Sequence, residues 1–306
     1  MKRAVSISIG SSKRNKAVEI DILGERVSIE RTGTDGDMDR AAQLYRDLDG
    51  KVDAFGVGGA DLGLMVDRHW YPLYSVHKMV ADIKITPTVD GTGLKSTLEK
   101  KSALVLKKTL GEKFAGKKAL VMTGVDRWGM LESFVNAGYE CVFGDMMFSL
   151  GLPFALRKVN SIKTMAALLM PVVGRVPFNW VYPTGKEQEK RTPKYAQWFE
   201  WADVVAGDCH YIRRYMPYQM KDKIIVTNTT TQEDMKIFRE AGVKYIVTTT
   251  PVLEGRSFGT NMMEAAILAA AGYKEPVDYA NPGNYFNQLG EYVDRIGFEP
   301  QFMELS

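Results

Sequence analysis

The residues best placed to do chemistry lie on a glycine-containing turn near the middle of the chain. Gly124 and Gly129 occupy the first and third glycine positions of a G-x-G-x-x-G motif, between an apolar strand and a helix. Asp145 follows the next strand, where a dinucleotide-binding βαβ unit carries the carboxylate that accepts a hydrogen bond from the ribose. This layout predicts a binding site for NAD, and less so for NADP, because a carboxylate repels a 2′-phosphate.

The middle position of the same motif holds Asp126 in place of glycine. A carboxylate adds bulk and negative charge where the backbone should approach a pyrophosphate. Arg127 could offset that charge by pairing either with Asp126 or with a phosphate. The alternative is a plain strand-to-helix turn in a sheet that binds no nucleotide.

Two further segments place polar side chains after strands. His210 stands beside Arg213 and Arg214, a combination that suits proton transfer next to a bound anion. A helix start with its arginines in solvent explains the same residues equally well. The segment 248–261 is rich in hydroxyls and glycines directly after a strand and is expected to line a ligand, with nicotinamide near its ends. Its candidate residues are Thr248, Thr249, Gly259 and Asn261.

Asp90 lies on a turn between Pro87 and two glycines, a setting that exposes a carboxylate. It is a candidate for general acid–base work, and its effectiveness would depend on the partner that adjusts its pKa. The alternative is that Asp90 only caps the helix that follows, because aspartate is a favoured N-cap residue.

The elements that must position these residues alternate between strand and helix. Strands are predicted at 5–9, 18–23, 27–31, 52–57, 119–123, 140–143, 202–208, 223–227 and 244–250, with helices between most of them. The pattern predicts an α/β fold: a Rossmann-like doubly wound parallel sheet preceded by an N-terminal α/β domain, with a cleft between the two. We expect a substrate domain at 1–100, a nucleotide domain at 101–272 and a C-terminal segment at 273–306 that packs back on the first domain. The long segment 146–199 is predicted to be a functional insertion.

Composition narrows the class of protein. The chain has 306 residues, enough for two domains, and its net charge of +3 favours neither nucleic acid nor an anionic membrane as a partner. Two cysteines without metal-ligand spacing suit a reducing cytoplasm, and the histidines lack partners for a metal site. The first residues are interpreted as a strand and not as a signal peptide, and no stretch is long enough to span a bilayer.

Three short stretches resemble landmarks of the shikimate and quinate dehydrogenase family. They are Asp90-Gly-Thr-Gly-Leu-Lys-Ser-Thr-Leu-Glu99, the strand, threonine loop and helix from Thr227 to Gly242, and Gly259-Thr-Asn-Met-Met-Glu-Ala-Ala266. Within that family the chain is most similar to bacterial proteins labelled quinate 5-dehydrogenase. The resemblance implies an NAD(P)-dependent oxidoreductase acting on a hydroxylated carboxylic acid. A homodimer is a further expectation, drawn from the general frequency of dimers.

The resemblance also assigns roles to residues. Asp90 would handle the substrate hydroxyl proton together with a lysine, but the family's Asn-Val-Thr-x-Pro-x-Lys motif is replaced by a lysine-free stretch at 56–63. A lysine from elsewhere would have to serve, with Lys95 and Lys186 as candidates and Lys13 and Lys78 as further options. Glu264 stands where the family tends to have a substrate-binding glutamine.

Ser11, Ser12 and Lys13 end the first strand and could bind a substrate carboxylate, as serines do at a comparable place in the resembled family. A basic surface turn is the alternative for these residues. The missing lysine, Asp126 and Glu264 together favour a second interpretation of the whole chain. In that interpretation the protein is a non-catalytic or regulatory protein that binds a nucleotide or metabolite on the same two-domain fold.

Overall fold

The computed structural model describes residues 1–111, 117–177, 191–250, 252–253 and 256–305, which form two compact units. Unit 1 comprises Met1–Thr97, Leu169–Thr184 and Phe258–Phe298. Unit 2 comprises Leu98–Leu168, Gly185–Ser257 and Glu299–Ser306. The segment expected at 273–306 is therefore divided, because its last residues supply a strand to the sheet of unit 2.

Unit 1 is built on a five-stranded sheet with the order β2-β3-β1-β4-β7. The strands are β1 (Lys2–Ser8), β2 (Lys16–Ile22), β3 (Glu25–Gly33), β4 (Ala54–Gly58) and β7 (Thr88–Val89). All neighbours run parallel except β2 and β3, which form a hairpin around Gly24 from the strands predicted at 18–23 and 27–31. Gly24 has φ +82°, a conformation that glycine adopts without strain.

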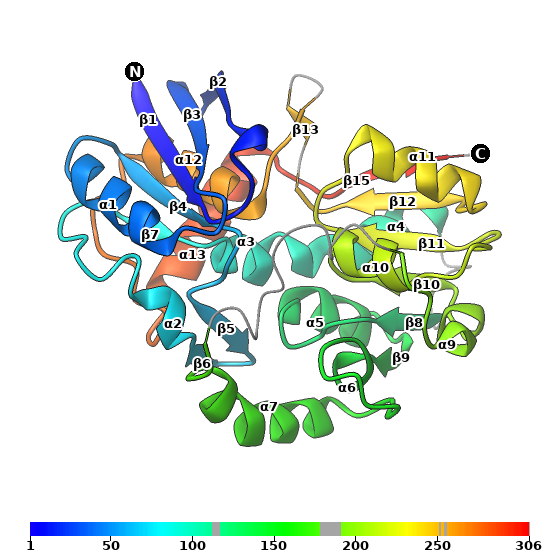
Figure 1. Cartoon of the computed structure of the whole chain (residues 1–306). Helices are drawn as coiled ribbons and strands as arrows, with labels where there is room; N and C mark the ends of the chain where they lie inside the picture. The colour runs from blue at the N-terminus through cyan, green and yellow to red at the C-terminus, as the bar shows by residue number, and fades with distance from the viewer. Residues whose placement is uncertain (112–116, 178–190, 251, 254–255, 306) are drawn as a thin grey trace. The chain divides into compact units, whose positions relative to one another are not determined.

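The helices of unit 1 include α1 (Met38–Leu48), α2 (Tyr74–His77), α3 (Thr92–Thr97), α12 (Thr260–Ala271) and α13 (Gly283–Ile296). A short hairpin joins β5 (Gly63–Val66) to β6 (His69–Pro72), and the 3-10 turn η1 spans Ser12–Arg14. Helix α12 is apolar on nearly every side and packs against β1 and β4 (Figure 1). A helix without a polar face is stable only when it is enclosed, so α12 forms the core of this unit.

Unit 2 contains a six-stranded sheet with the order β15-β12-β11-β10-β8-β9. Its strands are β8 (Lys118–Val121), β9 (Glu140–Phe143), β10 (Val204–Ala206), β11 (Ile224–Thr227), β12 (Tyr245–Thr248) and β15 (Gln301–Glu304). Five of these strands are parallel, and only β15 is antiparallel to its neighbour. When the parallel strands are numbered by their order in the chain, their order across the sheet is 2-1-3-4-5, the order of flavodoxin-like sheets. A complete Rossmann domain has the order 3-2-1-4-5-6, so the fold is a mixed α/β fold and the Rossmann-like expectation is not confirmed.

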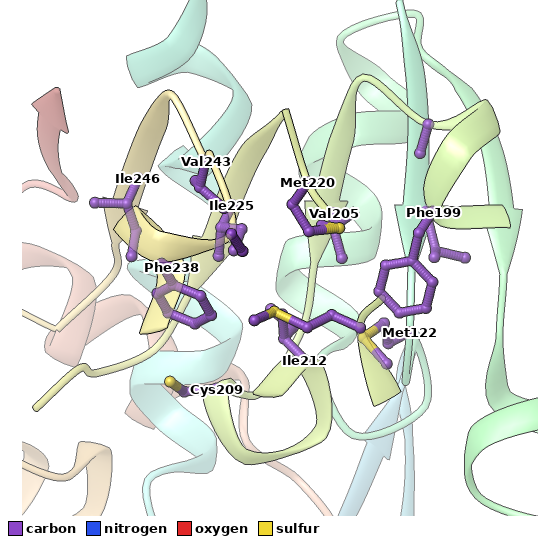
Figure 2. Close-up of a cluster of buried hydrophobic side chains, with 14 of the residues drawn as sticks. Met122, Phe199, Val205, Cys209, Ile212, Met220, Ile225, Phe238, Val243 and Ile246 are labelled. Carbon is purple, nitrogen blue, oxygen red and sulfur yellow. The ribbon is translucent and has the colours of Figure 1, made fainter. Parts of the chain in front are cut away.

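Helices surround this second sheet: α4 (Ser102–Leu110), α5 (Trp128–Asn136), α6 (Asp145–Phe148), α9 (Ala196–Trp201), α10 (Cys209–Tyr215) and α11 (Gln232–Glu240). The 3-10 turn η2 (Glu99–Lys101) precedes α4, and a two-residue hairpin pairs β13 (Val252–Leu253) with β14 (Arg256–Ser257). Figure 2 shows the core, in which Met122, Val205, Ile225 and Ile246 from the strands meet Phe238 from α11. Helix α7 (Val159–Val173) lies in the expected insertion, and no described helix is long and apolar enough to cross a membrane.

Candidate anion-binding site

The carboxyl ends of three parallel strands of unit 1 lie next to one another. Strand β1 is flanked by β3 and β4, so the strand order reverses at β1, and ligands of open α/β sheets bind beside such a reversal. The Ile9 N–H donates to the Gly58 carbonyl at 3.0 Å, which fixes the turn after β1 against the end of β4. The Thr34 N–H donates to the Ser8 carbonyl at 2.8 Å and ties the end of β3 to the same place.

Arg31 of β3 extends into this strand-end region. Its Nη2 donates to Ser8 Oγ at 2.9 Å, and its Nη1 donates to the Ser11 carbonyl at 3.0 Å. A β-carbon on Gly10 would come within 3.1 Å of Nη2, so the glycine leaves room for the guanidinium. The described residues place no carboxylate within ion-pair distance of Arg31, although a guanidinium has five N–H donors.

The electrostatic surroundings of Arg31 disfavour its charge. Burial of the half-buried side chain lowers the pKa of Arg31, and the nearby charge of Arg14 lowers it further, while Asp35 partly compensates. The other arginines of this sheet differ. Arg3 pairs with Glu30 at 3.1 Å, and Arg26 pairs with Glu19 at 3.3 Å, in addition to Asp21. Arg31 is thus a partly desolvated cation whose hydrogen bonds go to neutral oxygens.

Ser11, Ser12 and Lys13 form the turn after β1, and the Ser11 carbonyl accepts from Arg31 Nη1. Ser11 Oγ accepts from the Lys13 N–H at 3.2 Å, and the Ser12 N–H donates to Asp35 Oδ1 at 2.8 Å. The two serines are half-buried and Lys13 is exposed. Together with Arg31 they form what we call the strand-end site, which offers hydroxyls and positive charge and is suited to holding a carboxylate or phosphate.

Sequence reasoning missed Arg31. The signal was present, because Arg31 ends the predicted strand at 27–31 two residues before Gly33, and an arginine at a strand end that becomes partly buried needs a partner. Its identity as an unpaired cation required knowing that β3 lies beside β1. The register pairs Ser8 with Gly33, which brings the turn after Ser8 within reach of the Arg31 side chain.

Asp90 is buried, at 4% exposure, and both of its carboxylate oxygens accept hydrogen bonds from backbone N–H groups. Oδ1 accepts from the Thr92 N–H at 2.9 Å, at the first residue of α3, and Oδ2 accepts from the Leu62 N–H at 2.6 Å. These are the contacts expected of the capping alternative. Lys95 pairs instead with Asp61 at 2.8 Å, so the aspartate beside this candidate lysine is not Asp90. Lys186 lies outside the described residues.

Glu264 is fully buried in α12 and belongs to an internal network. Its Oε1 accepts from Tyr285 Oη at 2.5 Å and from Tyr279 Oη at 3.4 Å, and its Oε2 accepts from the Leu94 N–H at 2.9 Å. Burial raises the pKa of Glu264 to about 7, with a contribution from the charge of Asp90 and an opposing one from the Tyr285 hydroxyl. The carboxylate predicted to contact a substrate therefore holds three parts of unit 1 together.

The turn proposed for a dinucleotide in unit 2 holds a carboxylate of its own. Asp145 accepts from the Gly124 N–H at 3.0 Å and from the Val125 N–H at 2.8 Å. Burial raises the pKa of Asp145 to about 6, although these two hydrogen bonds act in the opposite direction. The amides that were assigned to a pyrophosphate thus already have an acceptor, and the carboxylate that was assigned to a ribose is only 3% exposed.

Arg127 is likewise committed within the protein. Its guanidinium pairs with Glu99 at 2.6 Å, with Asp208 at 2.8 Å and with Asp126 at 3.3 Å. Glu99 belongs to η2 and Asp208 to the turn after β10, so one side chain joins three segments of unit 2. Gly129 is buried in α5. Three carboxylates around one arginine, next to amides that are already bonded, do not fit a dinucleotide pyrophosphate.

The remaining candidate residues of the sequence belong to different units of the chain. In unit 2, His210 is exposed, and its N–H donates to Asp208 Oδ1 at 2.9 Å. The Thr248 hydroxyl is buried and has no hydrogen-bond partner among the described residues, and the Thr249 N–H donates to the Thr227 carbonyl at 2.8 Å. In unit 1, Gly259 precedes α12 and Asn261 Nδ2 donates to Ser6 Oγ at 2.7 Å.

Solved structures similar to this chain are remote. They include a protein from Mycobacterium smegmatis (15% identity, covering 97% of this chain and 98% of that chain, TM-score 0.32). Another is an NAD-dependent malic enzyme from Thermotoga maritima (12% identity, covering 96% of this chain and 77% of that chain, TM-score 0.40). A third is GanP, a glucose-galactose binding protein from Geobacillus stearothermophilus (10% identity, covering 99% of this chain and 97% of that chain, TM-score 0.37). At TM-scores of 0.40 and below, these likenesses support no conclusion about function. No curated protein matches the sequence.

Family models match nearly the whole chain in two parts. Residues 3–90 match a domain of unknown function (DUF8753), and residues 93–305 match a domain of unknown function (DUF8754). The assignment to shikimate and quinate dehydrogenases is therefore wrong, and the NAD and homodimer expectations attached to it have no support. The Asp90-Gly-Thr-Gly landmark arises from backbone geometry, since Gly91 has φ +99° and Asp90 caps the next turn. The chain belongs to the family described as a domain of unknown function, DUF8754.

Proposed function

We propose that this protein binds a small anionic metabolite, through the strand-end site of unit 1. The observation that carries the proposal is the contrast among the arginines of one sheet. Arg3 and Arg26 have carboxylate partners, whereas Arg31 is more buried and, among the described residues, is bonded to Ser8 and Ser11. A buried cation without a counter-ion is costly, and a ligand that supplies the counter-ion recovers that cost.

The chemistry of the site favours an anion that also carries hydroxyl groups. The Ser12 hydroxyl and N–H lower the pKa of Asp35 by hydrogen bonding, so this exposed carboxylate stays ionised on the rim of the site. A carboxylate accepts hydrogen bonds and donates none, which suits it to a ligand hydroxyl. The proposed ligand is therefore a hydroxylated carboxylic acid or a sugar phosphate, with its anionic group on Arg31.

Binding without chemistry is the form of function that the surroundings of the site support. The site consists of two serines, Lys13 and Arg31, with Asp35 on its rim, and the buried carboxylates of the unit, Asp90 and Glu264, are bonded to backbone and tyrosines. The rim carboxylate, Asp35, is exposed, and hydrogen bonds from Ser12 lower its pKa, away from the near-neutral value that suits a general base. The proposal thus follows the second of the two expectations drawn from the sequence, a metabolite-binding or regulatory protein.

The test is calorimetric titration in low-salt buffer with glucose 6-phosphate, gluconate and glucose. We expect the two anions to bind and glucose not to bind, with affinity falling as salt is added. Arg31→Gln should weaken binding at least about tenfold, since hydrogen bonds to charged groups contribute about 1.5–3 kcal/mol.

The matched control is Arg26→Gln, which changes an exposed arginine of the same strand that already has two carboxylate partners. It should bind both anions as the unmodified protein does. Equal loss in the two variants would mean that only the general positive charge matters. Unchanged binding in Arg31→Gln, or binding of glucose as tight as that of glucose 6-phosphate, would refute the proposal.

A further inference from the structure

Unit 2 carries the layout of a dinucleotide-binding turn, yet its contacts point to a different role. We infer that Asp145 is the permanent occupant of the anion-binding turn before α5, so that this turn takes no dinucleotide pyrophosphate. The inference concerns unit 2 alone and is independent of the strand-end site.

Both oxygens of Asp145 are engaged. Oδ2 accepts from Gly124 at 3.0 Å and Oδ1 accepts from Val125 at 2.8 Å, which is the way a bound phosphate uses the N–H groups of such a turn. A free phosphate would have to displace a carboxylate that is attached to the same chain and already aligned. An attached group loses little freedom on binding, so it competes at a high effective concentration.

Packing around the turn closes it further. A β-carbon on Gly124 would overlap the side chain of Leu131 and lie 3.3 Å from Asp145 Oδ2. The glycine is thus explained by the close approach of α5 and of the carboxylate, without a ligand. The glycine spacing that resembles a nucleotide motif has here an internal cause, the fit between a turn, a helix and a buried acid.

The charge beside the turn also opposes a phosphate. Asp126 lies on the turn and is about a quarter exposed, with a side-chain exposure of 27%. Arg127 could attract a phosphate, but its guanidinium is bonded to Glu99 and Asp208 at 2.6 and 2.8 Å. A pyrophosphate would have to break these ion pairs or bind beside the carboxylate of Asp126.

The first experiment is calorimetry of the full chain with NAD, NADP and inorganic pyrophosphate. We expect none of the three to bind through this turn. The variant Asp145→Ala should gain pyrophosphate binding at least about tenfold tighter than the unmodified protein, because two oriented N–H groups lose their acceptor.

The matched control is Asp126→Asn, which removes a carboxylate from the same turn and leaves Asp145 in place. It should gain no binding. A gain in Asp126→Asn but not in a folded Asp145→Ala would show that charge on the turn, and not the internal carboxylate, excludes the anion, and would overturn the inference.

A second measurement needs no substitution and covers the case in which Asp145→Ala does not fold. The amide resonances of Gly124 and Val125 should move together in a pH titration of the unmodified protein, following one ionisation near pH 6, the value that burial gives the pKa of Asp145. If the resonances of these two amides do not change between about pH 4 and pH 8, and shift when NAD is added, the inference is refuted.

Discussion

Replacing Glu264 by glutamine should stabilise unit 1 above neutral pH. The side chain is fully buried, and its pKa is raised from 4.5 to about 7, chiefly by burial. An acid whose pKa is higher in the folded state than in the unfolded state favours folding only while it is protonated. Its contribution is complete below about pH 4.5, declines as the pH rises, and is lost once the pH passes about 7.

The size of the effect follows from the change in proton affinity. A tenfold change in affinity is worth about 1.4 kcal/mol, so a rise from 4.5 to about 7 corresponds to roughly 3 kcal/mol of stability lost between acidic and alkaline pH. Glutamine is neutral at every pH and close in shape. Its amide oxygen can accept from the Leu94 N–H and its NH₂ can donate to Tyr285 Oη, so two of the three contacts of the carboxylate have a substitute.

The assay is urea unfolding at pH 5 and at pH 8.5, with hydrogen exchange at the Leu94 amide as the local readout. We expect the variant and the unmodified protein to differ by less than about 1 kcal/mol at pH 5. At pH 8.5 the variant should be more stable by about 1–3 kcal/mol. Glu291→Gln, an exposed change on α13, is the control and should leave the pH dependence as it is. An identical pH dependence in Glu264→Gln would refute the assignment of the buried proton to Glu264.

Two further predictions concern packing. Arg127→Met should destabilise unit 2 by about 3–5 kcal/mol in urea unfolding, because it removes the arginine that pairs with the buried Glu99 carboxylate at 2.6 Å. The double change with Glu99→Leu should recover at least half of the loss, and a loss below about 1 kcal/mol in Arg127→Met would contradict this prediction. Gly63→Ala should cost about 1–3 kcal/mol, because its β-carbon would overlap the Trp70 ring, and should alter the near-ultraviolet circular dichroism of the stacked Trp70 and Tyr279. Gly283→Ala, with open space around it, is the control, and equal stability of the two glycine variants would count against the packing argument.

Local pattern was sufficient where neighbours in sequence are neighbours in space. The hairpin around Gly24 and the strand, helix and strand from β8 to β9 follow from apolar runs and from the residues that end them. The α/β class follows in turn, since strands alternating with helices give parallel sheets. Helix ends do not follow from local pattern alone: α2 is short, and a 3-10 turn lies between α3 and α4, because tertiary contacts help to decide where a helix ends.

The roles of the polar residues depended on partners that are distant in the chain. Asp145 and Gly124 were placed together correctly, but the sequence could not tell whether the carboxylate faces a ribose or turns onto the amides of Gly124 and Val125. Glu264 depends on Tyr285, which α13 brings back beside α12. Arg31 can be recognised as a candidate ligand-binding residue only once β3 is known to lie beside β1, with no described carboxylate within ion-pair distance of the guanidinium.

The sequence by itself therefore determined the kinds of element and the turns that carry polar groups, because these are set by contacts within a few residues. Tertiary structure alone decided which charges are already satisfied inside the protein and which remain available, because charge pairing is a property of position in space. The contacts in the tertiary structure therefore favour the strand ends of unit 1, and not the glycine turn of unit 2, as the candidate site. There, Arg31 is a half-buried cation whose hydrogen-bond acceptors among the described residues are neutral oxygens.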